Sequence, residues 1–342
     1  MLGWKLRRQL SINQVPKVFR EQGILFGYRH PRSSAADCLL SVFQMTNETL
    51  NIWTHFLPAW YFLWKLFVLA YSLDIWNDMY AWPFLAYMLT CCIYPFTSSC
   101  AHTFSAMSTQ ARHICYFFDY GALSMYSLGS AIAYSTYVFP EEWINSTFHH
   151  YYVPTAVLNT VISTGLSCYS RLGAPYLHYN RDILERFPEI QQPTLSKTLR
   201  TLAFAYPYLF DSTPLFYRLY LCTGESCMES VIPVHYRHGV FAFLTCFIFA
   251  AHLPERLAPG CFDYIGHSHQ LFHICGIIGT HFQMEAIFID MNARRDWLLA
   301  SSPLLSRSQI VGSVGISIII SLTIIGVFSL ALYSTPMSSR KE

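Results

Sequence analysis

The chain has 342 residues, of which 53% are hydrophobic and only 12% are charged, roughly half the charged fraction of a soluble domain. A net charge of +2, without a basic stripe interleaved with aromatic residues, argues against nucleic acid as a partner. Long apolar runs recur between residues 51 and 334, so one bundle of membrane-spanning helices explains the chain more simply than two soluble domains.

The apolar segments predict eight membrane-spanning helices. A spanning helix needs about 20 mostly apolar residues. On this rule the helices are expected at 51–72, 81–102, 115–138, 150–170, 199–220, 239–254, 267–289 and 310–334. The predicted fold class is therefore an all-α polytopic membrane protein. It divides into an N-terminal segment (1–50), a seven-helix core (51–290), an outer loop with the eighth helix (291–334) and a tail (335–342).

The positions of lysine and arginine predict the orientation of these helices. Sixteen of the 22 lie in the N-terminal segment, in the tail, or next to the loops after the second, fourth and sixth helices. Five lie on the opposite side, and Lys65 lies within the first helix. Because cytoplasmic loops are enriched in these residues, both termini are expected in the cytoplasm.

Two motifs fall on the side that this orientation places outside the cell. Asn145 begins a glycosylation sequon, Asn145-Ser146-Thr147, close to the membrane. Cys222 and Cys227 share a short polar loop, where a disulfide would persist in an oxidising environment. The sequence leaves open whether the sequon is used and whether the cysteines are paired.

Three histidines are expected to meet at the cytoplasmic ends of their helices. His102 ends the second helix, whereas His269 and His273 begin the seventh and share one of its faces. Three neutral imidazoles are a common ligand set for catalytic zinc, with a fourth position left for water. The alternative is that these histidines only form hydrogen bonds between helices.

Two oxygen-bearing side chains are predicted to lie beside these histidines. Ser98 precedes His102 by one turn, and Asp119 lies near the cytoplasmic start of the third helix. Asp119 would act as a base toward metal-bound water, and Ser98 would orient that water or a substrate oxygen.

A second polar group opens the first helix at the same depth. Glu48, Asn51 and His55 follow an i, i+3, i+7 spacing. They are interpreted as a proton relay or as supports of the metal ligands. For Glu48 alone, a capping role at the helix start is the simpler interpretation.

Four deeper polar residues are candidates for a ligand pocket. Asp211 lies between Pro207 and Pro214 in the fifth helix, whose interrupted backbone could line a cavity. In the seventh helix, His281 and Glu285 are expected to continue the face of His269 and His273, and Gln283 lies between them. Polar contacts between helices are the alternative for each.

These residues give the chain a resemblance to the progestin and adipoQ receptor family, over about residues 40–290. The motifs that carry it are Asn47-Glu48-Thr49-Leu50-Asn51-Ile52-Trp53-Thr54-His55, Ser98-x-x-x-His102, Phe118-Asp119-Tyr120 and His269-Gln270-Leu271-Phe272-His273. The eighth helix and the stretches Asn13-Gln14-Val15-Pro16 and Gly27-Tyr28-Arg29 resemble its membrane progestin receptor branch.

The resemblance implies a zinc ion held by His102, His269 and His273, with Ser98 and Asp119 against the zinc-bound water. It also implies a plasma-membrane receptor, not an enzyme, that binds a progesterone-like steroid among membrane lipids and signals through inhibitory G proteins. The neighbouring adiponectin receptor branch implies the alternative, a zinc-dependent intramembrane hydrolase of lipid amides such as ceramide. The sequence leaves open whether the chain forms a homo-oligomer.

Overall fold

The computed structural model describes residues 7–73, 77–172, 193–220, 230–301 and 305–334. In this part of the chain the regular elements are helices, and the one β-bridge pairs Leu10 with Tyr28. The predicted all-α class is confirmed. Cys222, Cys227 and the tail lie outside the described residues.

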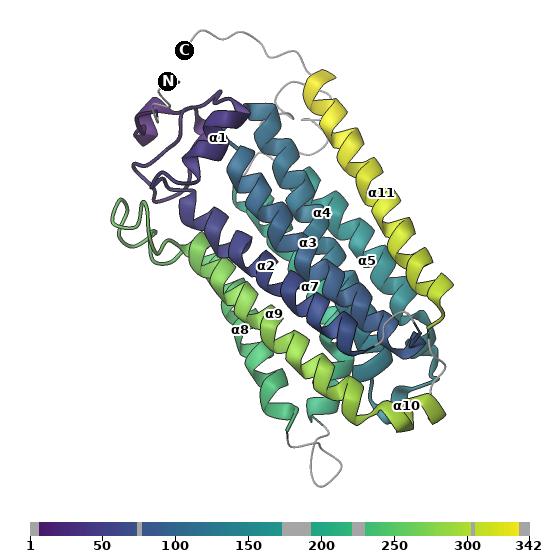
Figure 1. Ribbon diagram of the computed structural model, residues 1–342. Coiled ribbons are helices and arrows are strands. Elements are labelled where there is room, and N and C mark those ends of the chain that lie inside the picture. The colour runs from purple at the N-terminus through teal and green to yellow at the C-terminus, as the bar shows by residue number, and fades with distance from the viewer. Residues whose placement is uncertain (1–6, 74–76, 173–192, 221–229, 302–304, 335–342) are drawn as a thin grey trace.

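Each predicted spanning helix corresponds to one long helix in the structure (Figure 1). The long helices are α2 (Thr49–Ser72), α3 (Trp82–Phe104), α4 (Thr109–Ala133), α5 (Thr147–Leu172), α7 (Pro193–Tyr220), α8 (Ile232–Ala251), α9 (Ser268–Ala293) and α11 (Arg307–Ser334). A π-helical turn, Tyr134–Val138, extends α4 to the predicted end of the third helix.

The helices begin earlier than predicted where their first turns are polar. The structure starts α4 six residues before the predicted residue 115, because the Ser108 side chain accepts the Ala111 N–H at 3.0 Å and so caps the helix. It starts α8 seven residues before residue 239, with Pro233 in the first turn. A rule based on apolar runs does not detect either start.

Four helices among the described residues are long and apolar enough to cross a membrane by length and composition. They are Met79–Phe104, Ile232–Ala251, Ser268–Ala293 and Arg307–Tyr333. The remaining long helices are more polar but lie in the same bundle, and α2 exposes Trp60, Trp64 and Phe67 on its outer face. The chain is thus a polytopic membrane protein, and the number of eight spans stays a prediction.

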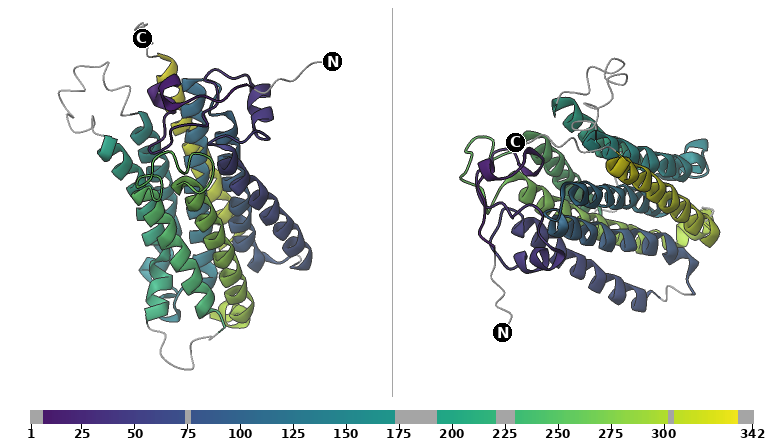
Figure 2. Two further views of the ribbon diagram at one scale, coloured as in Figure 1. Left: turned by 90° about the vertical axis from the view of Figure 1, so that its left-hand side faces the viewer. Right: turned by 90° about the horizontal axis from the view of Figure 1, so that it is seen from above.

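Seven of the long helices form a closed ring. In order around the ring, neighbours in contact are α2, α3, α4, α5, α7, α8 and α9, and α9 returns to α2. α11 packs against α4 and α5 from outside this ring; it forms the right-hand edge of the bundle in Figure 1 and is the yellow helix in both views of Figure 2. Of the neighbouring pairs, α7 and α8 touch each other least.

The N-terminal segment forms a cap over one end of the ring, together with the loop between α8 and α9. The Asp263 carboxylate accepts the Leu25 N–H at 2.8 Å and the Phe26 N–H at 2.9 Å. Gly23 has a φ of +80°, and a Cβ at this position would lie 2.7 Å from the Glu255 carbonyl oxygen, so only glycine fits. The short helices α1 (Ala35–Ser41) and α10 (Arg295–Ser301) lie at opposite ends of the bundle (Figure 1).

Close packing of α3 and α4 depends on Gly129. A Cβ at this position would lie 2.4 Å from Oγ1 of Thr90, whose hydroxyl is held by the Tyr87 carbonyl oxygen at 2.7 Å. We expect Gly129→Ala to lower the free energy of unfolding by about 1–3 kcal/mol, because the helices must move apart. The melting temperature of detergent-solubilised protein measures this effect.

Gly165→Ala in α5 is the matched control. A Cβ at Gly165 meets nothing within 4 Å, so its melting temperature should stay the same or rise. Equal melting temperatures for the two variants would contradict the assigned packing of α3 on α4.

Candidate metal centre and the cavity beside it

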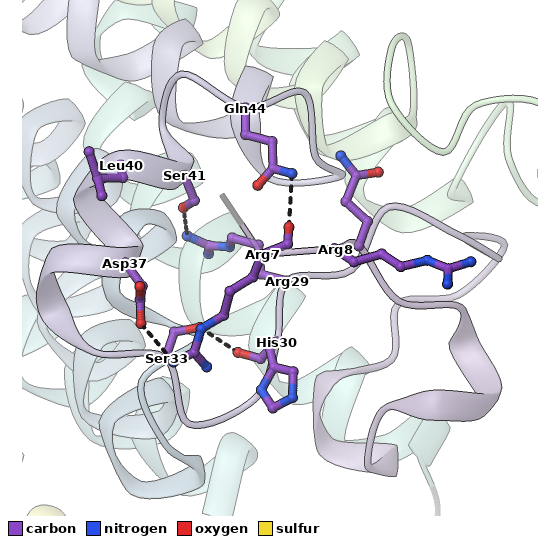
Figure 3. Close-up of a pocket in the computed structure, with 10 residues that line it drawn as sticks. Arg7, Arg8, Arg29, His30, Ser33, Asp37, Leu40, Ser41 and Gln44 are labelled. Atoms are coloured by element: carbon purple, nitrogen blue, oxygen red, sulfur yellow. Dashed lines mark hydrogen bonds and ion pairs between the residues drawn. The ribbon is translucent and has the colours of Figure 1, made fainter. Parts of the chain in front are cut away.

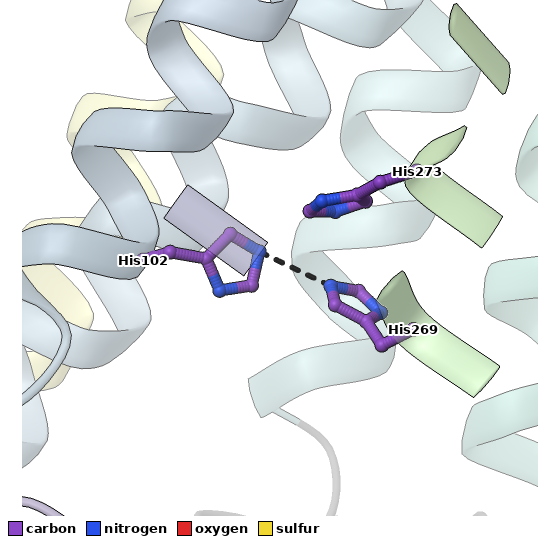
Figure 4. A group of neighbouring side chains, drawn as sticks. All are labelled: His102, His269 and His273. Atoms are coloured by element: carbon purple, nitrogen blue, oxygen red, sulfur yellow. Dashed lines mark hydrogen bonds between the residues drawn. The ribbon is translucent and has the colours of Figure 1, made fainter. Parts of the chain in front are cut away.

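His102, His269 and His273 come together at the capped end of the ring. One ring nitrogen from each lies within 4.8 Å of the corresponding atoms of the other two. Nε2 of His102 and Nε2 of His269 are 3.1 Å apart (Figure 4). Because α3 ends where α9 begins, residues 167 positions apart in the sequence meet at the same depth.

Hydrogen bonds on the far side of two rings fix which nitrogen faces the cluster. Nδ1 of His102 lies 2.8 Å from Oε2 of Glu48. Nδ1 of His273 lies 3.2 Å from the backbone oxygen of Asn51. Since a carboxylate and a carbonyl oxygen only accept, both Nδ1 atoms carry the proton, and each Nε2 keeps a free lone pair. Metal-ligating histidines usually have such a partner on the other nitrogen.

The donor set fits a nitrogen-liganded metal ion. Two nitrogens bound to a tetrahedral zinc at about 2.0–2.1 Å would lie about 3.3 Å apart, close to the contact between His102 and His269. Neutral imidazole is a ligand that zinc and neighbouring transition metals accept. A hydrogen bond between two neutral rings has the same length and remains the alternative.

The three residues that open α2 lie directly behind the cluster. Nδ2 of Asn51 donates to Oε2 of Glu48 at 2.8 Å, so this carboxylate oxygen is shared between Asn51 and His102. The His55 ring stacks on His273, with centroids 3.6 Å apart and planes at 12°. The structure therefore brings this predicted trio together. Glu48 occupies the N-cap position of α2, but its side chain makes no capping hydrogen bond and binds Asn51 and His102 instead.

Ser98 and Asp119 lie on the open side of the cluster. Ser98 is buried one turn before His102, and its hydroxyl interacts with the half-buried Asp119 carboxylate of α4. Both residues line the cavity described below. This placement suits the predicted contact with a metal-bound water, which stays a prediction.

Two arginines belong to this region although the sequence analysis assigned neither of them to the site. Arg112 is buried, pairs with Glu21 of the cap, and lies 4.0 Å from the far oxygen of Glu48. Arg29 donates to the Thr103 backbone oxygen at 2.7 Å and also to the His102 carbonyl, so it caps the C-terminus of α3. No spacing in the sequence points to these contacts, because their partners come from other elements.

A cavity of about 1180 Å³ extends from the cluster toward the opposite end of the ring. It lies between α7 and α8 on one side and α3, α4 and α9 on the other, with a mostly apolar lining. Leu209 of α7 and Val240 and Phe243 of α8 line it and are more than half exposed. Because these exposed residues also line the cavity, the cavity opens between α7 and α8, the neighbouring helices with the least contact.

Two of the four predicted pocket residues line this cavity. Asp211 and Gln283 are buried in its wall. The amide of Gln283 is fully engaged, because its oxygen accepts from Tyr87 at 3.1 Å and its nitrogen donates to Tyr134 at 2.9 Å.

The expectation that His281 and Glu285 continue the face of His269 and His273 is wrong. The two residues pair with each other at 3.2 Å, His281 contacts the Tyr61 hydroxyl of α2 at 2.8 Å, and neither lines the cavity. Each step of four residues turns about 40° around a helix, so four such steps lead to nearly the opposite face.

Two other polar sites lie at the ends of the bundle. Asn145 is exposed at the end away from the cap, where its side chain donates to the Ser301 backbone oxygen at 3.2 Å. A small pocket of about 30 Å³ lies in the cap, lined by Arg7, Arg29 and Asp37 (Figure 3). Arg7 pairs with Asp37 at 3.1 Å and Arg29 is already bound to α3, so this pocket has room for water only.

Comparison with known proteins shows the family. The model of the haemolysin-III related family matches residues 43–284. The zebrafish (Danio rerio) protein named membrane progestin receptor gamma-B is 64% identical, over 96% of this chain and 95% of its own. Human membrane progestin receptor gamma is 59% identical (98% and 97% covered), and human membrane progestin receptor delta 53% (98% and 94%). The resemblance found in the sequence is confirmed.

We expect purified protein to carry one tightly bound divalent metal ion, and His102→Ala to remove it. Glu48→Gln should weaken the affinity for the metal about 10–100-fold, because it loosens the His102 ring without removing a ligand. Elemental analysis combined with chelator titration measures both effects. His281→Ala, on another face of α9, is the control that should keep the metal, and wild-type protein without metal would contradict the assignment.

Proposed function

The chain belongs to the haemolysin-III related family, and we propose that it is a plasma-membrane receptor for a progesterone-like steroid. The observation that carries the proposal is the apolar cavity, which opens at the seam between α7 and α8 and ends at a polar cluster. Ligand pockets for rigid apolar molecules combine such a lining with a few fixed polar groups. The printed names of the relatives, membrane progestin receptors, point to the same ligand class.

In this proposal the cluster holds a zinc ion through His102, His269 and His273. Zinc would supply a Lewis acid that polarises a ligand carbonyl or a bound water. Glu48 and Asn51 keep the His102 ring in place, and the stack of His55 on His273 keeps the second ring from turning. The carboxylate of Asp119 would accept a proton and the hydroxyl of Ser98 would orient an oxygen at the cavity wall.

We propose that both termini lie in the cytoplasm and that the receptor signals through an inhibitory G protein. The bias of lysine and arginine toward the capped end supports this orientation. The link to G proteins rests on the family resemblance. A cytoplasmic cap tied to the cluster through Arg112 gives the cavity a physical connection to that side of the membrane.

Saturable binding of progesterone to the protein in lipid nanodiscs tests the receptor proposal. Leu123→Trp places an indole ring in the cavity wall, and we expect it to weaken binding at least about tenfold, or about 1.4 kcal/mol. Ile319→Trp adds the same ring on the exposed face of α11 and should leave binding unchanged. Absence of saturable binding by the wild type would reject the proposal.

A second candidate is a hydrolase of lipid amides such as ceramide. The observation that favours it is the carboxylate of Asp119 beside the histidine cluster, in a cavity that lipid can enter. If this activity exists, we expect His273→Ala to abolish ceramide turnover and Asp119→Asn to reduce it at least about 100-fold, the lower end of the usual range for a proton-transferring group. Mass spectrometry of the released fatty acid measures turnover, and equal turnover in wild type and His273→Ala would reject the hydrolase.

A further inference from the structure

Three buried side chains in the outer half of the cavity have a polar atom without a hydrogen-bond partner. They are Asp211 of α7, with Oδ1 free, and His235 and His238 of α8, with Nδ1 and Nε2 free. Each is at most 4% exposed, and each lines the cavity. Buried polar groups are normally paired, so these atoms in the cavity wall are available to a polar group of a ligand.

The partners of the histidine rings show that the free atoms are acceptors. Nδ1 of His238 lies 3.0 Å from the Gly279 carbonyl oxygen, so Nδ1 carries the proton and Nε2 has a free lone pair. Nε2 of His235 lies 2.9 Å from a carboxylate oxygen of Asp290, which leaves its Nδ1 as acceptor in the neutral ring. Both rings therefore offer a lone pair to the cavity.

Asp211 supplies the complementary donor. The Ser127 hydroxyl donates to its Oδ2, and no lysine or arginine among the described residues pairs with it. An ionised carboxylate without a cation is costly at this depth, so the neutral acid, which carries an O–H, suits the site.

Asp211 and His238 lie on α7 and α8, the two helices that border the seam, and both line the cavity. The Tyr208 ring of α7 lies 6.1 Å from the His238 ring, and Asp211 follows Tyr208 by one turn. The pair therefore combines one donor and one acceptor. The one cluster of metal-ligand type among the described residues is the histidine group at the capped end, so these atoms form a different kind of site.

We propose that the outer half of the cavity is a second polar ligand site, which binds a hydroxyl group of the apolar ligand. The hydroxyl donates to Nε2 of His238 and accepts from Asp211. A ketone only accepts and would leave Nε2 of His238 unpaired, so the site selects an alcohol over the corresponding ketone. This inference rests on the proposed steroid-receptor function and adds the polar group that the ligand carries.

The test compares three steroids in nanodiscs. They are progesterone, which has a ketone at each end, and the two alcohols made by reducing one ketone or the other. We expect one alcohol to bind the wild type about tenfold more tightly than progesterone. In His238→Phe this preference should fall to less than about twofold, with progesterone affinity retained as the measure of correct folding. Asp211→Leu removes a donor that an alcohol and a ketone oxygen can both accept from, so it should weaken the alcohol and progesterone alike.

Two further variants sharpen the result. Asp211→Asn keeps a donor and an acceptor and should retain the preference, and so should His281→Phe, which lies outside the cavity. A wild type that prefers neither alcohol, or a preference that survives in His238→Phe, would overturn the second site alone. Failure of the wild type to bind all three steroids would overturn the receptor function and this site together.

Discussion

A charged carboxylate buried among membrane helices is costly unless several donors share it. Glu48 meets this requirement through His102 of α3 and Asn51 of its own helix, with Arg112 of α4 4.0 Å from its second oxygen. Arg112 also reaches Glu21 of the cap. One buried charge thereby sets the ring orientation of a candidate metal ligand and ties three helices to the N-terminal cap.

The side of the ring that α7 and α8 form is held together by different contacts. At its outer end, α7 and α8 both reach Asp290 of α9, which accepts two hydrogen bonds from Arg218 at 2.7 and 2.8 Å and contacts His235 at 2.9 Å. At the inner end, Lys197 of α7 donates to the Ala250 backbone oxygen of α8 at 3.0 Å. Between these two contacts, residues of both helices line the cavity. The limited contact between α7 and α8 leaves room for a ligand.

The cavity has a different polar group at each end. At the capped end, the unprotonated Nε2 atoms of His102 and His273 suit a metal ion, and the carboxylate of Asp119 lines the same part of the cavity. At the outer end, His238 and Asp211 suit a hydroxyl. A rigid apolar ligand with a polar group at each end would satisfy both, which links the proposed receptor function to the shape of the bundle.

The sequence by itself determined the helices, their order and the shared depth of His102, His269 and His273. These follow from apolar length and from the alternation of helix direction, both of which are local properties of the chain. The i, i+4 spacing of His269 and His273 was also enough to predict that they share one face of their helix. Only the helix starts with polar first turns, such as Thr109, escaped this reasoning.

The tertiary structure alone decided which residues meet across helices. The same spacing rule failed for His281 and Glu285, because a rotation of about 40° per step accumulates along a helix. The contacts of Arg29 and Arg112, the limited contact between α7 and α8, and the free nitrogen of His238 depend on how separate helices pack. Hydropathy indicates whether a residue is buried, but not which residues of other helices lie beside it. No pattern in the chain could therefore reveal these contacts.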